Sequence, residues 1–372
     1  MTNKITVFFT GFLFLFAIVV SAAYMGGILL PRASVVSPHI VPLSSDLPPI
    51  ISTHSYPFGQ EIITISVPVS DSVYRGAKIT DKEVTLYGNV SEEIWVTDSY
   101  RSMVNDPAQE DLYRSLAGGF KTVKNSNGLS DDEYLELITT FVQSLHYETL
   151  TDNPAKFPIE TVVDGSGDCD DKSLLLAGLL SREGYRVALM SFGPEAHMAV
   201  GVAADDYLYK NTNYTYIETT NISFVGVPAE TLKGGLKLQS SPIIIPIGNG
   251  TKIYTSGKET RFINNAFLQS EQKSNELEPQ LKSLESDLKE RQERITQLEV
   301  QMKSLRGSGN IQSYNAQVSV HNGLISDYNT RLSTYQALFA QYEKTVQVHN
   351  YILEHEFDRP GVYEYVKQNM PG

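Results

Sequence analysis

A heptad repeat of apolar residues occupies the C-terminal part of this sequence and permits few folds for it. Apolar side chains recur at alternating spacings of four and three over 277–305, with Arg291 as the break, and again over 311–353. The intervening stretch 306–310 reads Arg-Gly-Ser-Gly-Asn, which is typical of a turn. Two heptad helices of similar length across a short turn predict an antiparallel coiled-coil hairpin, which we assign to residues 261–357.

An apolar segment near the N-terminus has the length of a membrane span. The 26 residues from Ile5 to Leu30 carry no charge, and about 20 such residues cross a bilayer as a helix. We therefore predict a transmembrane signal-anchor at 1–30. The small residues at 21–23 suit signal peptidase, so a cleaved secretory signal is the alternative. Residues 31–60 hold six prolines and predict a semi-extended stalk.

Composition limits the classes of protein to which the part of the chain between the stalk and the hairpin can belong. At 372 residues with 41% hydrophobic side chains, the chain can form two or three globular units. A net charge of −13 argues against nucleic-acid binding, which requires clustered Lys and Arg. The single cysteine, Cys169, excludes an internal disulfide framework. We expect a globular domain over 61–260, opened by strands near 61–68 and 83–87, and a short C-terminal helix within 358–372.

Cys169 stands where a helix is predicted to begin. Leucines follow it at helical spacing, at positions 174, 175, 176, 179 and 180, and Gly184 is placed to end the helix. A short apolar strand follows at 186–191. A thiol at a helix N-terminus lies close to unpaired amide groups and the positive end of the helix dipole, which favour the thiolate. We therefore predict that Cys169 is a nucleophile, with Asp170 and Asp171 satisfying amides of the first turn.

A base and an acid follow the thiol along the chain. His197 opens a strand-like alternation, and Glu218 shares one face of a later alternating segment with Tyr216. Thiol chemistry requires a base within hydrogen-bond reach and an acceptor that fixes the base's tautomer. His197 and Glu218 are predicted for these two roles. His146 is the alternative base, and Asp205 and Asp206 are the alternative acceptors.

These motifs resemble the transglutaminase-like superfamily, in particular its membrane-anchored archaeal members. The matching residues are Gly-Asp-Cys-Asp-Asp at 167–171, the helix that ends at Gly184, His197 before a Val/Gly strand, and Glu-Thr-Thr at 218–220. Many relatives have Asp-Pro-Thr at the last position. The resemblance covers roughly 107–225 and implies an α+β fold, in which the cysteine-bearing helix of a papain-like core packs on an antiparallel sheet.

The resemblance also implies an activity. We expect a membrane-anchored, extracytoplasmic thiol enzyme that acts on peptide or carboxamide bonds, as a cysteine peptidase, amidase or acyltransferase, with hydrolysis favoured over crosslinking. Its triad would be Cys169, His197 and Glu218, without a cofactor. The dispersed histidines and lone cysteine have no metal-ligand spacing, so no metal site is predicted. Surface or envelope proteins would be the substrates.

The alternative is a binding protein without activity. In that interpretation the core keeps the fold of the enzyme without its activity, on a single-pass membrane anchor, and the hairpin recruits a coiled-coil partner.

Overall fold

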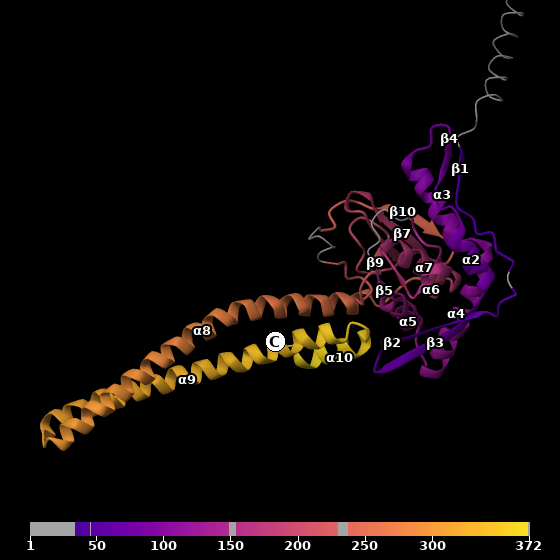
Figure 1. The fold of residues 1–372 in the computed structure, drawn as a ribbon. Helices are drawn as coiled ribbons and strands as arrows, with labels where there is room; N and C mark the ends of the chain where they lie inside the picture. Colours follow the sequence, from indigo (N-terminus) through magenta and orange to yellow (C-terminus); the bar gives the residue numbers. More distant parts are fainter. Residues whose placement is uncertain (1–33, 45, 149–153, 230–236, 371–372) are drawn as a thin grey trace, which may run out of the picture.

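The computed structural model describes residues 34–44, 46–148, 154–229 and 237–370, which form an α+β body with a long helical hairpin (Figure 1). This confirms the predicted α+β class at its coarse level. The elements along the chain are β1 (Ser34–Val36), β2 (Ile50–Phe58), β3 (Glu61–Val69), α2 (Asp71–Ile79), β4 (Thr85–Tyr87), α3 (Glu92–Val104), η1 (Pro107–Gln109), α4 (Glu110–Asn127), α5 (Asp131–Ser144), β5 (His146–Tyr147), α6 (Pro158–Asp164), β6 (Ser166–Gly167), α7 (Cys169–Arg182), β7 (Val187–Phe192), η2 (Gly193–Glu195), β8 (His197–Ala203), β9 (Tyr214–Ile217), β10 (Ile243–Ile247), α8 (Gly257–Gly307), α9 (Ile311–Glu354) and α10 (Arg359–Asn369).

A four-stranded antiparallel sheet forms the centre of the body. Its strand order is β10-β7-β8-β9, and α7 packs against it through contacts with β7, β8 and β10. Every residue of β8 is buried, because the strand lies inside the sheet and carries small or apolar side chains on both faces. The sheet and α7 together hold the predicted site residues, since Cys169 begins α7, His197 begins β8 and Glu218 follows β9.

The start of α7 is shaped by its acidic neighbours. The Asp168 side chain accepts hydrogen bonds from the amides of Asp170 and Asp171, and the Asp168 amide donates to Oδ2 of Asp171, which completes a capping box. A Cβ on Gly167 would lie 2.6 Å from Cβ of Asp171, so only glycine fits there. The helix ends as predicted, with Gly184 at φ +87°.

The predicted stalk is wrong over residues 50–58. Residues 50–58 form β2, which pairs antiparallel with β3, and Tyr56 is buried in the core. The alternation that marks this strand is hard to see in the sequence, because Ser52 and His54 lie on its inward face while Ile51 is exposed. Pro57 is tolerated because it lies in a two-stranded sheet.

The hairpin consists of α8 and α9, which run side by side (Figure 1). Its first helix begins at Gly257, before the predicted boundary, and passes through Pro279 without a break. Arg291, which interrupts the heptad, forms ion pairs with Asp287 of its own helix and Asp327 of the other. The apolar residues that α8 buries against its partner fall on the predicted seam: Leu277, Leu281, Leu288, Ile295 and Met302.

The base of the hairpin is fastened to the body. Val362 and Val366 of α10 pack with Ile263 of α8 and Ile352 of α9 in one apolar cluster, which also holds Phe224 of the body. The short C-terminal helix therefore closes the hairpin base and joins it to the body.

No helix within the described parts of the chain is long and apolar enough to cross a membrane. The predicted anchor at 1–30 lies outside the described residues.

Candidate active site

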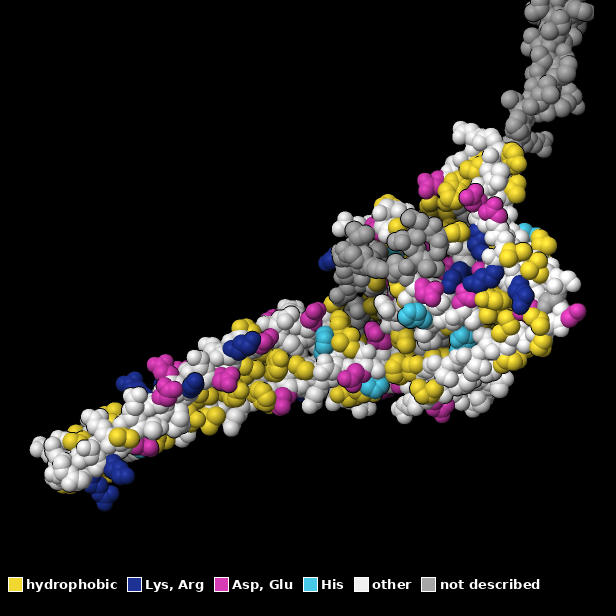
Figure 2. Space-filling view, in the orientation of Figure 1, with side chains coloured by type: hydrophobic (Ala, Val, Ile, Leu, Met, Phe, Trp, Pro, Cys, Tyr) yellow, Lys and Arg dark blue, Asp and Glu magenta, His cyan; other side chains and the backbone are white. Residues whose placement is uncertain are grey.

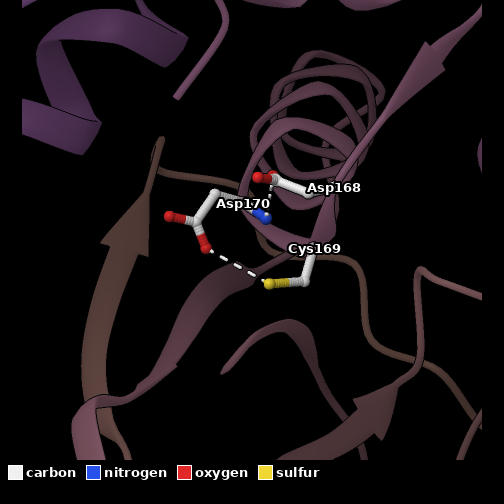
Figure 3. Close-up of side chains that lie close together, drawn as sticks. All are labelled: Asp168, Cys169 and Asp170. Atoms are coloured by element: carbon white, nitrogen blue, oxygen red, sulfur yellow. Dashed lines mark hydrogen bonds between the residues drawn. The ribbon is translucent and has the colours of Figure 1, made fainter. Parts of the chain in front are cut away.

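Cys169 is buried at the tip of α7, where its thiol contacts a carboxylate. The sulfur donates a hydrogen bond to Oδ1 of Asp170 at 3.5 Å, as Figure 3 shows. The other oxygen of Asp170 accepts a 2.9 Å hydrogen bond from the Tyr100 hydroxyl of α3. The prediction that Asp170 and Asp171 satisfy amides of the first turn is wrong, because Asp168 accepts from those amides. Asp171 accepts instead from the amides of Asp168 and Lys156, and Asp170 from the thiol and Tyr100.

The surroundings of Cys169 favour the thiol over the thiolate. Burial raises the thiol pKa, and the nearby charges of Asp170 and Asp168 raise it further. A backbone hydrogen bond from Met198 acts in the opposite direction but does not outweigh them. These surroundings therefore do not favour the thiolate that was expected at the helix end. Burial and like charge exceed the effect of the helix dipole.

His197 and Glu218 are brought together, with a tyrosine hydroxyl beside both. His197 Nε2 lies 3.6 Å from Glu218 Oε2 and 3.0 Å from the Tyr216 hydroxyl. That hydroxyl donates its proton to Glu218 Oε2 at 2.7 Å. Since a phenol has one proton to give, its oxygen accepts from the imidazole, so the proton of neutral His197 lies on Nε2. Nδ1 remains as the basic nitrogen, with no hydrogen bond from any described residue.

Glu218 is ionised although it is buried. Burial alone would raise its pKa, but the His197 ring and the hydrogen bonds of Thr220 lower the pKa to about 2. The amides of Thr219 and Thr220 each donate to Oε1 at 2.9 Å, and the Thr220 hydroxyl donates at 2.7 Å. A carboxylate held in this way is a fixed acceptor for the histidine and tyrosine beside it.

Aromatic rings surround the imidazole. The centroid of the Phe192 ring lies 6.1 Å from that of the His197 ring and 6.4 Å from that of the Tyr216 ring. Tyr209 stacks at a tilt 5.4 Å from Tyr216, in the same apolar cluster. This shell excludes water from His197 and strengthens the interaction between the imidazole and the carboxylate.

Tyr147 is delivered to the same region by a short parallel pairing. It lies opposite Gly167 in the β5–β6 pairing, and Gly167 precedes Cys169 by two residues. Burial raises its pKa to about 12, and the nearby carboxylate of Asp168 contributes to the rise. The pairing of β5 with β6 therefore places a phenol close to the thiol.

The alternative site residues lie elsewhere. His146 is exposed, and Asp205 is exposed on the loop after β8. Asp206 forms an ion pair with Arg261 of α8 at 2.9 Å. None of these three therefore competes with His197 and Glu218 for their positions.

Sequence reasoning missed the residues that link the predicted ones. The sequence places Tyr216 on one face with Glu218 but does not indicate its hydrogen bonds to His197 and Glu218, nor those of Tyr100 and the Cys169 thiol to Asp170. Lys172 also went unnoticed, although a lysine one turn after Cys169 in a leucine-rich helix is an anomaly visible in the sequence. For Tyr100 no local signal exists, because its partner lies 70 residues further along the chain.

Asp168, Cys169 and Asp170 form the one described group whose ligand atoms, all within 4.8 Å of one another, suit a metal ion. Asp168 already caps two amides, and Asp170 already accepts from the thiol and Tyr100. These bonds account for both carboxylates without an ion.

A cavity of about 350 Å³ lies away from this site, at the hairpin base. Its walls come from α8, α9 and the end of α10, including Lys273, Glu276, Gln341 and Met370. The thiol itself is closed in, with Cys169 only 9% exposed.

A scan against models of protein families finds no match for this chain, and searches of curated proteins and of solved structures return none either.

Proposed function

We propose that this protein is a membrane-anchored, extracytoplasmic thiol enzyme of the transglutaminase-like type, which acts on peptide or carboxamide bonds. The observation that carries the proposal is the arrangement at the start of β8. His197 is aligned by Tyr216 and Glu218, and the next residue, Met198, hydrogen-bonds the sulfur of Cys169 through its backbone. The sulfur thus contacts the residue that follows an oriented imidazole, and nucleophilic catalysis by a thiol requires such a base within reach.

The reaction would proceed in two steps. His197 Nδ1 takes the thiol proton as the sulfur attacks the carbonyl carbon, and the imidazolium then gives that proton to the leaving amine. Glu218 stabilises the imidazolium as it forms, through its ionised carboxylate. Before attack, the thiol proton must leave Asp170 for His197. Water then releases the acyl group from the sulfur, which we favour over transfer to an amine because water is abundant outside the cell.

The single cysteine makes the test direct, since every acyl-thioester that forms must be at Cys169. We would measure burst formation of the acyl-enzyme with an activated amide or ester, in the wild type and in His197→Asn. The expected loss is about a hundredfold or more, because the general base is absent. His146→Asn is the matched control, since that histidine is exposed and outside the site. Equal bursts in the two variants would contradict the proposal.

One observation favours a second candidate, a binding protein without activity. The thiol is buried and bonded to a carboxylate, and its pKa is raised rather than lowered. Hydrophobic side chains meanwhile run along the hairpin (Figure 2), and Val300, Val320 and Phe339 are exposed there. A hairpin with this surface would recruit a coiled-coil partner.

Two measurements separate the candidates. If Cys169 in the native protein reacts with an alkylating agent no faster than in the urea-unfolded chain, the binding protein is favoured. Deletion of residues 270–356 gives the complementary result. Loss of a complex without a change in thiol reactivity favours the binding protein, and a reactive, folded body favours the enzyme.

A further inference from the structure

Lys172 is fully buried one turn after Cys169 on α7, and among the described residues its ammonium donates hydrogen bonds to backbone carbonyls alone. Its Nζ donates to the carbonyl oxygens of Gln143 at 3.0 Å, Leu145 at 2.9 Å and Thr220 at 3.4 Å. These three bonds use all three protons of an ammonium group. The lysine is therefore held at a defined point between three segments.

Two of these carbonyls belong to the end of α5, and the third follows the acid of the site. Gln143 and Leu145 lie in the last turn and at the C-cap of α5, where helix carbonyls lack partners within the helix and carry the negative end of its dipole. Thr220 belongs to the loop whose amides and hydroxyl bind Glu218. The ammonium thus joins α7, the end of α5 and the Glu218 loop.

Neighbouring side chains strengthen the same junction. The Gln143 amide donates to the carbonyls of Glu218 at 2.8 Å and Ser223 at 3.0 Å. Ser173, beside the lysine on α7, donates to the Met198 carbonyl at 3.2 Å and bonds the Thr219 hydroxyl at 3.0 Å. The Ser173 bonds therefore link α7, which carries Cys169, to β8 and to the Glu218 loop, and the Gln143 bonds tie the end of α5 to that loop.

Burying an ammonium is costly unless its hydrogen bonds are complete. Burial lowers the pKa of Lys172 to about 8, partly offset by the charge of Glu218, so the group is charged at neutral pH. The ammonium therefore fixes the three carbonyls relative to one another, because moving any of them leaves a buried donor without a partner.

We propose that Lys172 is a positioning residue, whose ammonium group ties the Glu218 loop to the helix that carries Cys169. The carboxylate of Glu218 is thereby held against Tyr216 and His197. The consequence for catalysis rests on the proposed function, but the geometry can be tested without any activity.

The test observes His197 directly in the full-length protein. Imidazole nitrogen NMR signals of His197, identified by their loss in His197→Asn, report its tautomer. In Lys172→Met we expect the Nε2–H preference to weaken, so that the chemical shifts of the two ring nitrogens converge, because Glu218 is no longer held in place. Lys156→Met is the matched control, since that lysine bonds Glu148 and the Ser166 carbonyl but no part of the Glu218 loop.

A double variant shows whether Lys172 acts through Glu218. In a Glu218→Gln background, Lys172→Met should change the His197 signals little, because the carboxylate through which Lys172 acts on His197 is already absent. Unchanged His197 signals in Lys172→Met, or a full and additive effect in the double variant, would overturn the proposal. Should Lys172→Met fail to unfold cooperatively, Lys172→Gln is judged by the same criteria, since its shorter amide cannot reach all three carbonyls.

Acylation kinetics then separate this inference from the proposed function. An active wild type should lose about tenfold to a hundredfold in kcat in Lys172→Met at nearly constant KM, because the lysine aligns the site without touching substrate. A wild type that forms no acyl-enzyme, but whose His197 signals respond to Lys172→Met, refutes the activity and leaves the positioning role intact.

Discussion

The Arg359 guanidinium of α10 donates a 2.5 Å hydrogen bond to Oε1 of Glu136 in α5, across 223 residues of sequence. Both side chains are buried, and the Tyr254 hydroxyl donates to the same oxygen at 2.6 Å. Burial raises the pKa of Glu136, while the charge of Arg359 acts to lower it. This pair fastens the hairpin base to the helix whose other end binds Lys172.

Removal of Arg359 should therefore destabilise the body. Arg359→Met leaves the Glu136 carboxylate buried without its cation, and we expect a loss of about 3 kcal/mol in the free energy of unfolding, measured by urea denaturation. The double variant with Glu136→Gln should recover much of the loss, since no uncompensated charge remains. Equal losses in the single and double variants would show that the ion pair is not the cause.

Tyr216 should be required for activity and dispensable for folding. Tyr216→Phe removes the hydroxyl that accepts a hydrogen bond from His197 and donates one to Glu218. We expect the rate of acylation to fall by about tenfold while the melting temperature changes little. Tyr209→Phe is the matched control, because that buried hydroxyl has no hydrogen-bond partner among the described residues. Its loss should leave the rate unchanged and stability equal or higher.

Asp170 should suppress the reactivity of the thiol. Asp170→Asn removes the negative charge nearest the sulfur, which lowers the thiol pKa; we expect alkylation of Cys169 at pH 7 to accelerate about tenfold, or one pKa unit. Asp111→Asn, at an exposed position on α4, is the control and should have no effect. A slower reaction in Asp170→Asn would mean that the carboxylate assists the thiol.

Glu356 should make stability decrease as the pH rises. Burial raises its pKa to about 7, so between about pH 4.5 and 7 the unfolded chain loses the proton that the folded chain keeps. The protonated carboxyl group of Glu356 therefore favours the folded state at low pH, and this stabilisation is lost as the pH rises through the pKa that Glu356 has in the folded protein. Glu356→Gln should accordingly stabilise the protein by about 1 kcal/mol at pH 8 and by little at pH 4, in urea titrations. An equal gain at both values would exclude titration of Glu356 as the cause.

Local sequence patterns determined the secondary structure of this protein closely. The Ser130–Glu133 capping box begins α5, Gly184 ends α7 as predicted, and the heptads form α8 and α9. Each feature depends on residues a few positions apart, whose geometry follows from the helix itself. The order Cys169, His197 and Glu218 could likewise be read from strand and helix periodicity.

Tertiary structure alone decided how the site is connected. The Tyr100–Asp170 bond, the three carbonyls around Lys172 and the burial that keeps the thiol protonated all join elements far apart in the chain. The strand at 50–58 belongs here too, because its inward face became recognisable only once β3 and the core lay against it. Periodicity specifies which face of an element is buried, but the partner that covers it, and hence each pKa and hydrogen bond, depends on how the elements pack.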